Sequence, residues 1–372
     1  MKMGFHTTGN SSTSRRTTQV VNLGYLRNRI ASTTRKFNYC KEHSANPSLC
    51  INQFINISPS QSTDGALQVM VDLSGVVFTS TDYGVSFYPY QITGNPQLGL
   101  VKTSYNGTHK VAIDGDSSYL YVFGNNTWTQ TPNQFFNIDI SSDGKYQTAT
   151  NYVDPSGSLF HSTDYGNNWT QVNSVNYAIT TSLSSSGQQQ VAACAANIAI
   201  ATVFISNNYG VTWMPTNIVS DQYTWICANI SGDASIITVG SLEGIIQYSR
   251  NNGATWTEST INWSPETIEP FVGSICSSYN GQYQAFISWF AFDGGGPPGF
   301  IYLSTDFGIT WNQLNVPQFT WTSIAMSNSG KFISAISIDD NGSYYYYRSI
   351  DYGETFEEIP YGSTQIFGID IN

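Results

Sequence analysis

The octet STDYGVSF at residues 80–87 decides the fold, because five close copies of it follow along the chain. Successive copies begin 82, 44, 43, 55 and 45 residues apart. The first interval is twice the usual one, and its middle holds a degenerate copy, YVFGNNTW at residues 121–128, which keeps Gly124 and the final aromatic residue. A repeat of this period is the signature of a repeat architecture, and the count predicts seven units. The five close copies read STDYGNNW from Ser162, SNNYGVTW from Ser206, SRNNGATW from Ser249, STDFGITW from Ser304 and SIDYGETF from Ser349.

A second motif gives the same count. A small polar residue followed by glycine closes an apolar run once in every unit, and such dipeptides supply the positive-φ residues of β-hairpin turns. Each unit therefore reads as four antiparallel strands in about 46 residues, which is typical of a propeller blade. We predict an all-β, seven-bladed β-propeller of four-stranded antiparallel blades. The seven dipeptides are Asp64-Gly65, Asn106-Gly107, Asp143-Gly144, Ser186-Gly187, Ser231-Gly232, Asn280-Gly281 and Ser329-Gly330.

The residue types of the octet suit a tight turn. Its glycine tolerates a backbone conformation that is costly for other residues. The Asp or Asn two positions earlier can accept hydrogen bonds from the amides of the turn itself. The final Trp or Phe is placed to pack against the sheet.

The pattern S-x-D-x-G-x-T-W resembles the Asp box, or bacterial neuraminidase repeat, and the resemblance covers residues 51–372. In Asp-box propellers the box joins the third and fourth strands of a blade at its outer edge, away from the central channel. The resemblance therefore implies that the box residues are structural. They are Asp82, Gly84, Asp164, Gly166, Trp169, Asn208, Gly210, Trp213, Asn251, Gly253, Trp256, Asp306, Gly308, Trp311, Asp351 and Gly353.

The C-terminus predicts how the ring closes. FGIDIN at residues 367–372 matches FNIDIS at residues 136–141, an inner strand, and no further strand follows it. FINIS at residues 54–58 is an alternative inner strand for blade 1, although Pro59 interrupts it. We favour the C-terminal strand, because joining both chain ends in one blade removes an exposed sheet edge.

Charge divides the chain into two parts. The net charge of −11 combines +7 in residues 1–50 with −18 in residues 51–372. We therefore predict a basic N-terminal arm at 1–50 and the propeller at 51–372. The acidic body makes nucleic acid an unlikely partner. We expect the arm either to dock on an acidic partner, including the body of a second copy, or to be a tail that only adds solubility.

Targeting signals are weak. The arm lacks the apolar run of a secretory signal, yet its Arg-, Ser- and Thr-rich composition resembles an organellar transit peptide. Cytoplasmic or virion localisation is favoured over an organelle, and no run is long and apolar enough to cross a membrane as a helix. The Asn-, Ser- and Tyr-rich style resembles propellers encoded by large DNA viruses of protists.

The sequence favours a protein that is not an enzyme. Sialidases of this superfamily hold a carboxylate with three arginines, but only Arg250 and Arg348 follow residue 50, and both lie at boxes. A glycosidase needs two carboxylates; acids such as Asp114, Glu243 and Asp339 lie outside the boxes without a recognisable pattern. Three cysteines fall in apolar runs, Cys40 and Cys50 are equally well read as a pair or as free thiols, and no metal site or cofactor is predicted.

The sixth unit carries the candidate binding residues. It is the longest unit, and two of its tryptophans have no counterpart in the repeat. These aromatic side chains either form a contact platform or pack the insertion onto its own blade. The candidates are Trp263, Trp289, Phe290 and Asp293.

We predict a non-catalytic binding or scaffold propeller that engages a protein or glycan through its channel-face loops and the arm. The alternatives are a carbohydrate-active propeller, hydrolytic or lectin-like, and an organellar assembly factor resembling the photosystem II type.

Overall fold

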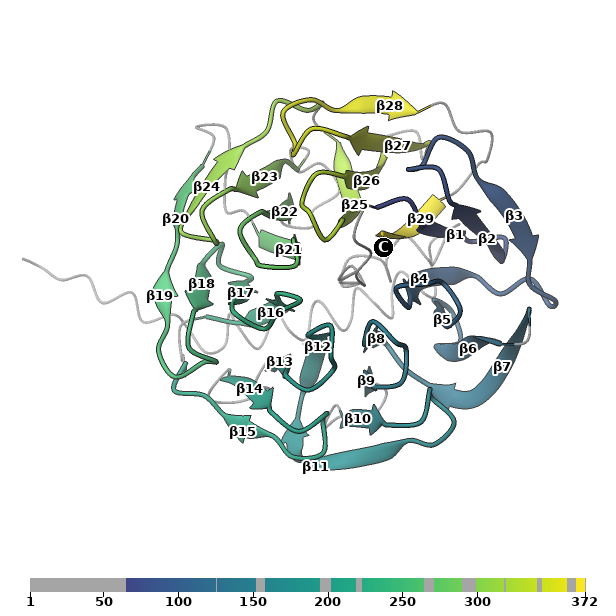
Figure 1. Ribbon diagram of the computed structural model, residues 1–372, viewed down its shortest axis with the longest axis horizontal. Helices are drawn as coiled ribbons and strands as arrows, with labels where there is room; N and C mark the ends of the chain where they lie inside the picture. The colour runs from purple at the N-terminus through teal and green to yellow at the C-terminus, as the bar shows by residue number, and fades with distance from the viewer. Residues whose placement is uncertain are drawn as a thin grey trace, which may run out of the picture.

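The computed structural model describes residues 65–124, 126–151, 158–194, 202–218, 223–263, 271–289, 299–317, 319–339, 343–359 and 366–371. All regular structure in these ranges is β-strand, and the strands form seven sheets arranged in a ring, one sheet per blade (Figure 1). The seven-bladed, all-β prediction is therefore confirmed. The arm at 1–50, with Cys40 and Cys50, and the alternative strand at 54–58 lie outside the described residues.

Each blade runs from an inner strand to an outer strand. Blade 1 holds β29 (Ile366–Ile371), β1 (Gln68–Asp72), β2 (Val76–Ser80) and β3 (Tyr88–Gln91). Blade 2 holds β4 (Leu98–Thr103), β5 (Lys110–Asp114), β6 (Tyr119–Gly124) and β7 (Thr127–Gln134). Blade 3 holds β8 (Asn137–Ile140), β9 (Gln147–Asn151), β10 (Ser158–Ser162) and β11 (Thr170–Asn176). Blade 4 holds β12 (Ala178–Leu183), β13 (Gln190–Cys194), β14 (Thr202–Ser206) and β15 (Met214–Pro215).

Blades 5 to 7 continue the ring. Blade 5 holds β16 (Trp225–Ile230), β17 (Ile237–Ser241), β18 (Ile246–Ser249) and β19 (Thr257–Glu258). Blade 6 holds β21 (Phe271–Ser277), β22 (Gln284–Trp289), β23 (Ile301–Ser304) and β24 (Thr310–Gln313), and β20 (Thr260–Asn262) adds a fifth, parallel strand outside β24. Blade 7 holds β25 (Thr320–Met326), β26 (Ile333–Ile338), β27 (Tyr344–Ser349) and β28 (Glu357–Ile359).

The C-terminal strand closes the ring as predicted. In Figure 1 the yellow β29 lies beside the purple β1, and the two pair antiparallel from Gln68–Ile371 to Asp72–Ile366. Ile369 and Ile371 are fully buried, and Asp370 accepts a hydrogen bond from the amide of Thr103 in blade 2. Pairing the last strand with the first described one leaves blade 1 with the same four strands as its neighbours.

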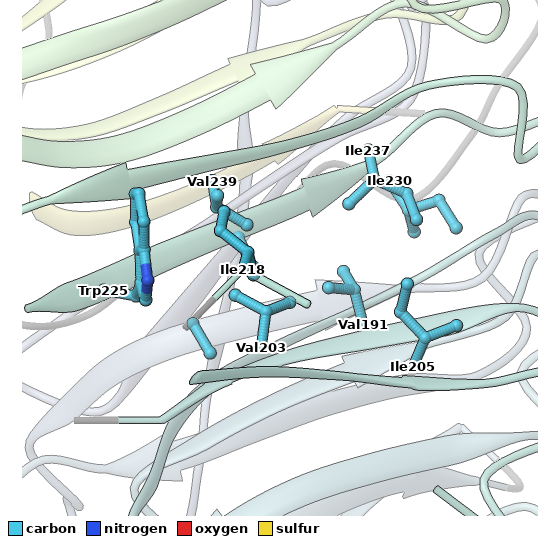
Figure 2. Close-up of a cluster of buried hydrophobic side chains, with 10 residues drawn as sticks. Val191, Val203, Ile205, Ile218, Trp225, Ile230, Ile237 and Val239 are labelled. Carbon is cyan, nitrogen blue, oxygen red and sulfur yellow. The ribbon is translucent and has the colours of Figure 1, made fainter. Parts of the chain in front are cut away.

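The hydrophobic core lies between adjacent blades. Figure 2 shows one such layer, in which Val191, Val203 and Ile205 of blade 4 face Trp225 and other residues of blade 5. The inner strands of the sheets are buried on both faces, as β4, β8 and β16 show along their whole length. One ion pair lies within this interior. Lys102 Nζ is 3.4 Å from Asp139 Oδ1, and both side chains are buried. Burial raises the pKa of Asp139, although Lys102 opposes the shift.

One face of the disc carries the boxes and, in blades 2 to 7, the turns between the first and second strands; we call it the box face. Backbone hydrogen bonds join these first turns from blade 2 to blade 7, so they form an arc around the central axis. The bonds are Tyr105 N to Ser142 O, Ser142 N to Ser185 O, Ser185 N to Gly232 O, Asp233 N to Tyr279 O and Tyr279 N to Asn328 O, at 2.7–2.9 Å.

Two turns differ from the expectation. In blade 5 the positive φ of the first turn is at Ala234 (61°), not at Gly232, and the Ala234 amide donates to the Ser231 carbonyl. The predicted dipeptide Ser231-Gly232 was therefore two positions early, because Asp233-Ala234 occupies the turn without a glycine. In blade 2 Gly124 pairs with Thr127, so a tight hairpin replaces the degenerate box.

Candidate functional site

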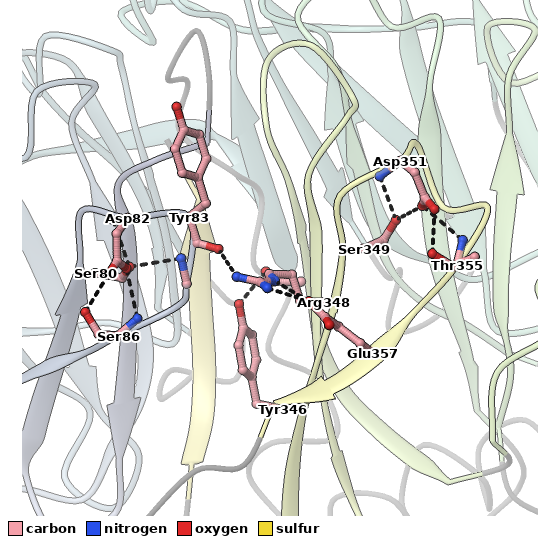
Figure 3. Close-up of polar contacts among 12 residues, drawn as sticks. Ser80, Asp82, Tyr83, Ser86, Tyr346, Arg348, Ser349, Asp351, Thr355 and Glu357 are labelled. Atoms are coloured by element: carbon pink, nitrogen blue, oxygen red, sulfur yellow. Dashed lines mark hydrogen bonds and ion pairs between the residues drawn. The ribbon is translucent and has the colours of Figure 1, made fainter.

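Each box is a self-contained network of hydrogen bonds. In blade 1 the amide of Gly84 donates to Ser80 Oγ at 2.9 Å, and the Ser86 amide and hydroxyl donate to the two Asp82 carboxylate oxygens (Figure 3). Hydrogen bonds from Ser86 and Ser80 lower the pKa of Asp82 to about 2. The carboxylate therefore stays ionised at neutral pH while it caps the turn.

The other boxes repeat the arrangement with either Asp or Asn. Burial raises the pKa of Asp164, Asp306 and Asp351, but hydrogen bonds within each box outweigh it, so each pKa lies below its usual value. Asn208 and Asn251 each accept through Oδ1 from the amide of the seventh residue of their own box, a threonine. Each also donates through Nδ2 to the hydroxyl of that threonine. An amide can replace the carboxylate because the threonine hydroxyl then accepts instead of donating.

The box tryptophans close each turn from the sheet side. The indole Nε1 of Trp169, Trp213, Trp256 and Trp311 donates to the carbonyl of the box glycine, at 2.8–3.1 Å. Trp311 and Trp213 are buried, whereas Trp169 and Trp256 are half-buried.

The fourth residue of every box contacts the preceding blade. This residue has a positive φ in all six boxes, between 55° and 67°. Its side chain meets an aromatic ring of the preceding blade in four pairs: Tyr83 on Phe332, Tyr165 on His109 and Tyr209 on Tyr146 are stacked, and Tyr352 is tilted against Tyr283. In the remaining two boxes Arg250 lies 5.1 Å from the ring centroid of Phe307, and Asn252 Nδ2 donates to Asn207 Oδ1.

The two arginines of the propeller therefore work at seams between blades. Arg250 reaches from blade 5 to the box of blade 6. Arg348 pairs with Glu357 in blade 7 and donates from Nη1 to the carbonyl of Tyr83 in blade 1, 2.8 Å away (Figure 3). The second contact crosses the seam between the last blade and the first, where Tyr346 also donates to Gln68.

Exposed apolar side chains gather on the box face. The described residues include twelve exposed large hydrophobic side chains, and nine of them lie in box-face turns. Six of the nine belong to the consecutive blades 6, 7 and 1, and we call these six the box-face sector. Acidic residues accompany them in the same turns, namely Asp82, Asp306, Asp351 and Glu354, with Lys331 as the basic residue. The sector comprises Tyr279, Ile309, Ile350, Tyr352, Tyr83 and Val85.

On the opposite face, four described acids cap turns. Each of the four accepts a backbone N–H at 2.8–2.9 Å, so each of these carboxylates already has a structural partner. The pairs, acceptor first, are Asp72 with Val76, Asp114 with Asp116, Glu243 with Thr224 and Asp339 with Ser343. No group of three or more His, Cys, Asp or Glu in the described ranges could hold a metal ion.

The candidates from the sixth unit are only partly described. Trp263 is half-buried and packs edge-on against Tyr302 and Phe286, with ring centroids 5.0 Å and 6.0 Å apart. Trp289 is the last residue of β22, and its backbone pairs with Phe271. Phe290 and Asp293 lie outside the described residues.

The sequence did not point to the box-face sector. Its residues occupy the variable positions of the repeat, and periodicity alone does not tell which of these face solvent. One signal was available but not specific to the sector: the boxes at Ser80, Ser206 and Ser304 have Val85, Val211 and Ile309 at their sixth position, between the turn glycine and a polar residue. An apolar side chain in a tight surface turn is hard to bury.

Comparisons with known proteins agree with this architecture. Residues 302–313 match the family model described as BNR/Asp-box repeat. No curated protein sequence matches the chain significantly. No helix in the described ranges is long and apolar enough to span a bilayer.

Solved structures share the fold at low sequence identity. The xyloglucanase of glycoside hydrolase family 74 from Xanthomonas campestris is 9% identical with a TM-score of 0.58; the match covers 85% of this chain and 54% of the enzyme, so the chain spans about half its length. YCF48 bound to a D1 peptide is 15% identical with a TM-score of 0.54, over 79% of this chain and 94% of YCF48. The β-propeller domain of Cps50 (Swd1) from Myceliophteria thermophila is 10% identical with a TM-score of 0.58, over 79% and 95%.

Proposed function

The chain is a seven-bladed Asp-box β-propeller, and on that premise we propose that it is a non-catalytic scaffold that binds a protein partner through the box-face sector. The observation that carries this proposal is the concentration of exposed apolar side chains on blades 6, 7 and 1. A run of exposed apolar side chains beside polar groups is typical of protein-binding surfaces. The surface differs from the channel-face loops through which the sequence predicted binding, and from the sixth-unit residues that it offered as candidates.

We further propose that the recurring Ser, Asp or Asn, Gly and aromatic positions of the box stabilise the blades and supply none of the apolar contact surface. Their polar atoms bond within the box, as with Asp82 and Ser86. The side chains at the second and sixth box positions, such as Ile350 and Val85, are exposed. The repeat thus separates residues that hold the turn from residues free to make contacts.

A carbohydrate-active role is the alternative, and an assembly role is a special case of protein binding. The xyloglucanase shares the fold alone, and four described acids of the opposite face are engaged in capping turns. YCF48, whose solved structure contains a D1 peptide, is a propeller that takes a peptide partner. Binding to protein therefore has the stronger support.

The test is affinity capture with matched surface variants of the full chain. Val85→Ser/Ile309→Ser/Ile350→Ser removes three apolar side chains of the sector, none of which is buried. Val211→Ser/Met214→Ser is the control, because both residues are exposed but lie in blade 4. Mass spectrometry should find a protein that the wild type and the control retain and the sector variant loses.

The contrary outcome is that all three proteins capture the same set in equal amounts. A glycan array probes the alternative in parallel. Glycan binding that survives the sector variant, without any protein that depends on the sector, would replace the proposed function with the carbohydrate-active one.

A further inference from the structure

The N-terminal segment joins the propeller beside the box-face sector. Gly65 is the first described residue. Gly65 packs closely against blade 7, because a Cβ added to it would lie 2.9 Å from Ser327 Cβ and 3.0 Å from Phe332 Cβ. Phe332 stacks on Tyr83 of the sector, with ring centroids 4.8 Å apart. The chain therefore enters the propeller at the seam between blades 7 and 1, beside the sector.

The two surfaces are complementary in charge. Residues 1–50 carry a net charge of +7. The described box-face turns of blades 6, 7 and 1 carry four carboxylates and one lysine, Lys331. Opposite charges within a Debye length, about 8 Å at physiological salt, attract one another and fix orientation.

The two surfaces are also complementary in apolar character. Residues 19–30 read QVVNLGYLRNRI, in which five apolar side chains precede two arginines and Ile30 follows them. The sector places apolar side chains beside carboxylates in the same way, as with Val85 beside Asp82 and Ile350 beside Asp351. A segment with both characters can bury its apolar side chains while its arginines meet the carboxylates.

The tether is long enough to reach all three blades. Ile30 and Gly65 are 35 positions apart, and a random coil of that length spans about 30–35 Å on average. A four-stranded blade is about 15–20 Å wide. A segment tethered at this distance has an effective concentration of order mM, so even a weak site would be filled within the same chain.

We propose that residues 15–41 bind the box-face sector of their own chain. This inference rests on the proposed function, because it uses the same surface. It makes the arm the resident occupant of the sector, and a protein partner must displace it. The arm and the partner then compete for the sector, so dissociation of the arm limits the rate at which the partner binds.

Carbodiimide cross-linking of the purified full chain tests the inference. The reagent activates a carboxylate, and a lysine amine within contact distance attacks it to form an amide bond. Peptide mapping should join Lys36 or Lys41 to Asp82, Asp351 or Glu354, within single chains. Half-buried or exposed acids of the opposite face, Asp116, Glu243 and Asp339, serve as the internal comparison.

The matched variants supply the control. Val85→Ser/Ile309→Ser/Ile350→Ser keeps every cross-linking partner and should lower the yield roughly tenfold, whereas Val211→Ser/Met214→Ser should leave it unchanged. Cross-links to opposite-face acids, cross-links between two chains, or a yield that ignores the sector variant would each overturn the inference. Partner capture is a separate readout. If partner capture depends on the sector but cross-linking does not, the proposed function survives and the inference fails. If cross-linking depends on the sector but capture does not, the inference survives and the proposed function fails.

Discussion

Trp311 is the box tryptophan whose ring is most completely buried, with none of its surface exposed. Its indole donates to Gly308, and its ring meets Phe286 edge-on at 5.0 Å. We predict that Trp311→Ala lowers the free energy of unfolding by about 3–5 kcal/mol, measured by urea denaturation. Trp256→Ala is the control, because that ring makes the same hydrogen bond but is half-buried. Equal losses for the two variants would show that ring burial does not set the cost.

Asp82 links stability to acid pH. Hydrogen bonds hold its pKa near 2 in the folded chain, against about 3.9 in an unfolded one. The stabilisation is therefore complete above pH 4 and is lost as the pH falls from about 4 towards 2. Asp82→Asn imitates the natural boxes of Asn208 and Asn251 and cannot titrate. The urea midpoint of this variant should depend less steeply on pH between 4 and 2 than that of the wild type; parallel curves would contradict the assignment.

At the scale of elements, β29 decides whether the ring is closed. Ile369 is fully buried on this strand, in a cluster that joins blade 1 to blade 7 through residues such as Met70 and Ala325. We expect Ile369→Ala to cost about 2–5 kcal/mol in urea denaturation. Ile350→Ala should change stability by less than about 0.5 kcal/mol, because that side chain is exposed. Deletion of residues 366–372 should lower the melting temperature far more than either substitution, and an unchanged melting curve would mean that blade 1 does not need the strand.

The fifth strand of blade 6 gives Trp263 a packing role to test. β20 is fixed by the hydrogen bond from Asn262 to Asn312 and by the contact of Trp263 with Tyr302. We predict that Trp263→Ala lowers the urea midpoint, but less than Trp311→Ala, and leaves partner and glycan binding intact. Loss of binding at an unchanged midpoint would instead support the contact platform that the sequence also allowed.

At the scale of the whole molecule, the sequence predicts what every unit repeats. Blade number, box position and the closing strand follow from periodicity, because each blade must bury the same kinds of side chain. The contacts between blades did not follow from it. Tyr83 stacks on Phe332 and Arg348 reaches Tyr83 across the seam, and neither partner can be found within a single repeat. The turn at Ala234 was missed because a non-glycine residue adopts the positive φ there.

The position of the binding surface is likewise a property of the whole ring. Three consecutive blades contribute to the box-face sector, and one of them is completed by the two ends of the chain. The exposed residues of one box would be an ordinary surface feature. Their succession over blades 6, 7 and 1 is what distinguishes the sector.

The dissociation constant of the captured partner for three purified proteins tests this account most directly. These are the wild type, Val85→Ser/Ile309→Ser/Ile350→Ser and Val211→Ser/Met214→Ser. The account predicts that the sector variant binds about tenfold more weakly or worse, at an unchanged melting temperature, while the blade 4 variant binds like the wild type. Unchanged affinity of the sector variant, or an equal loss in the blade 4 variant, would contradict it.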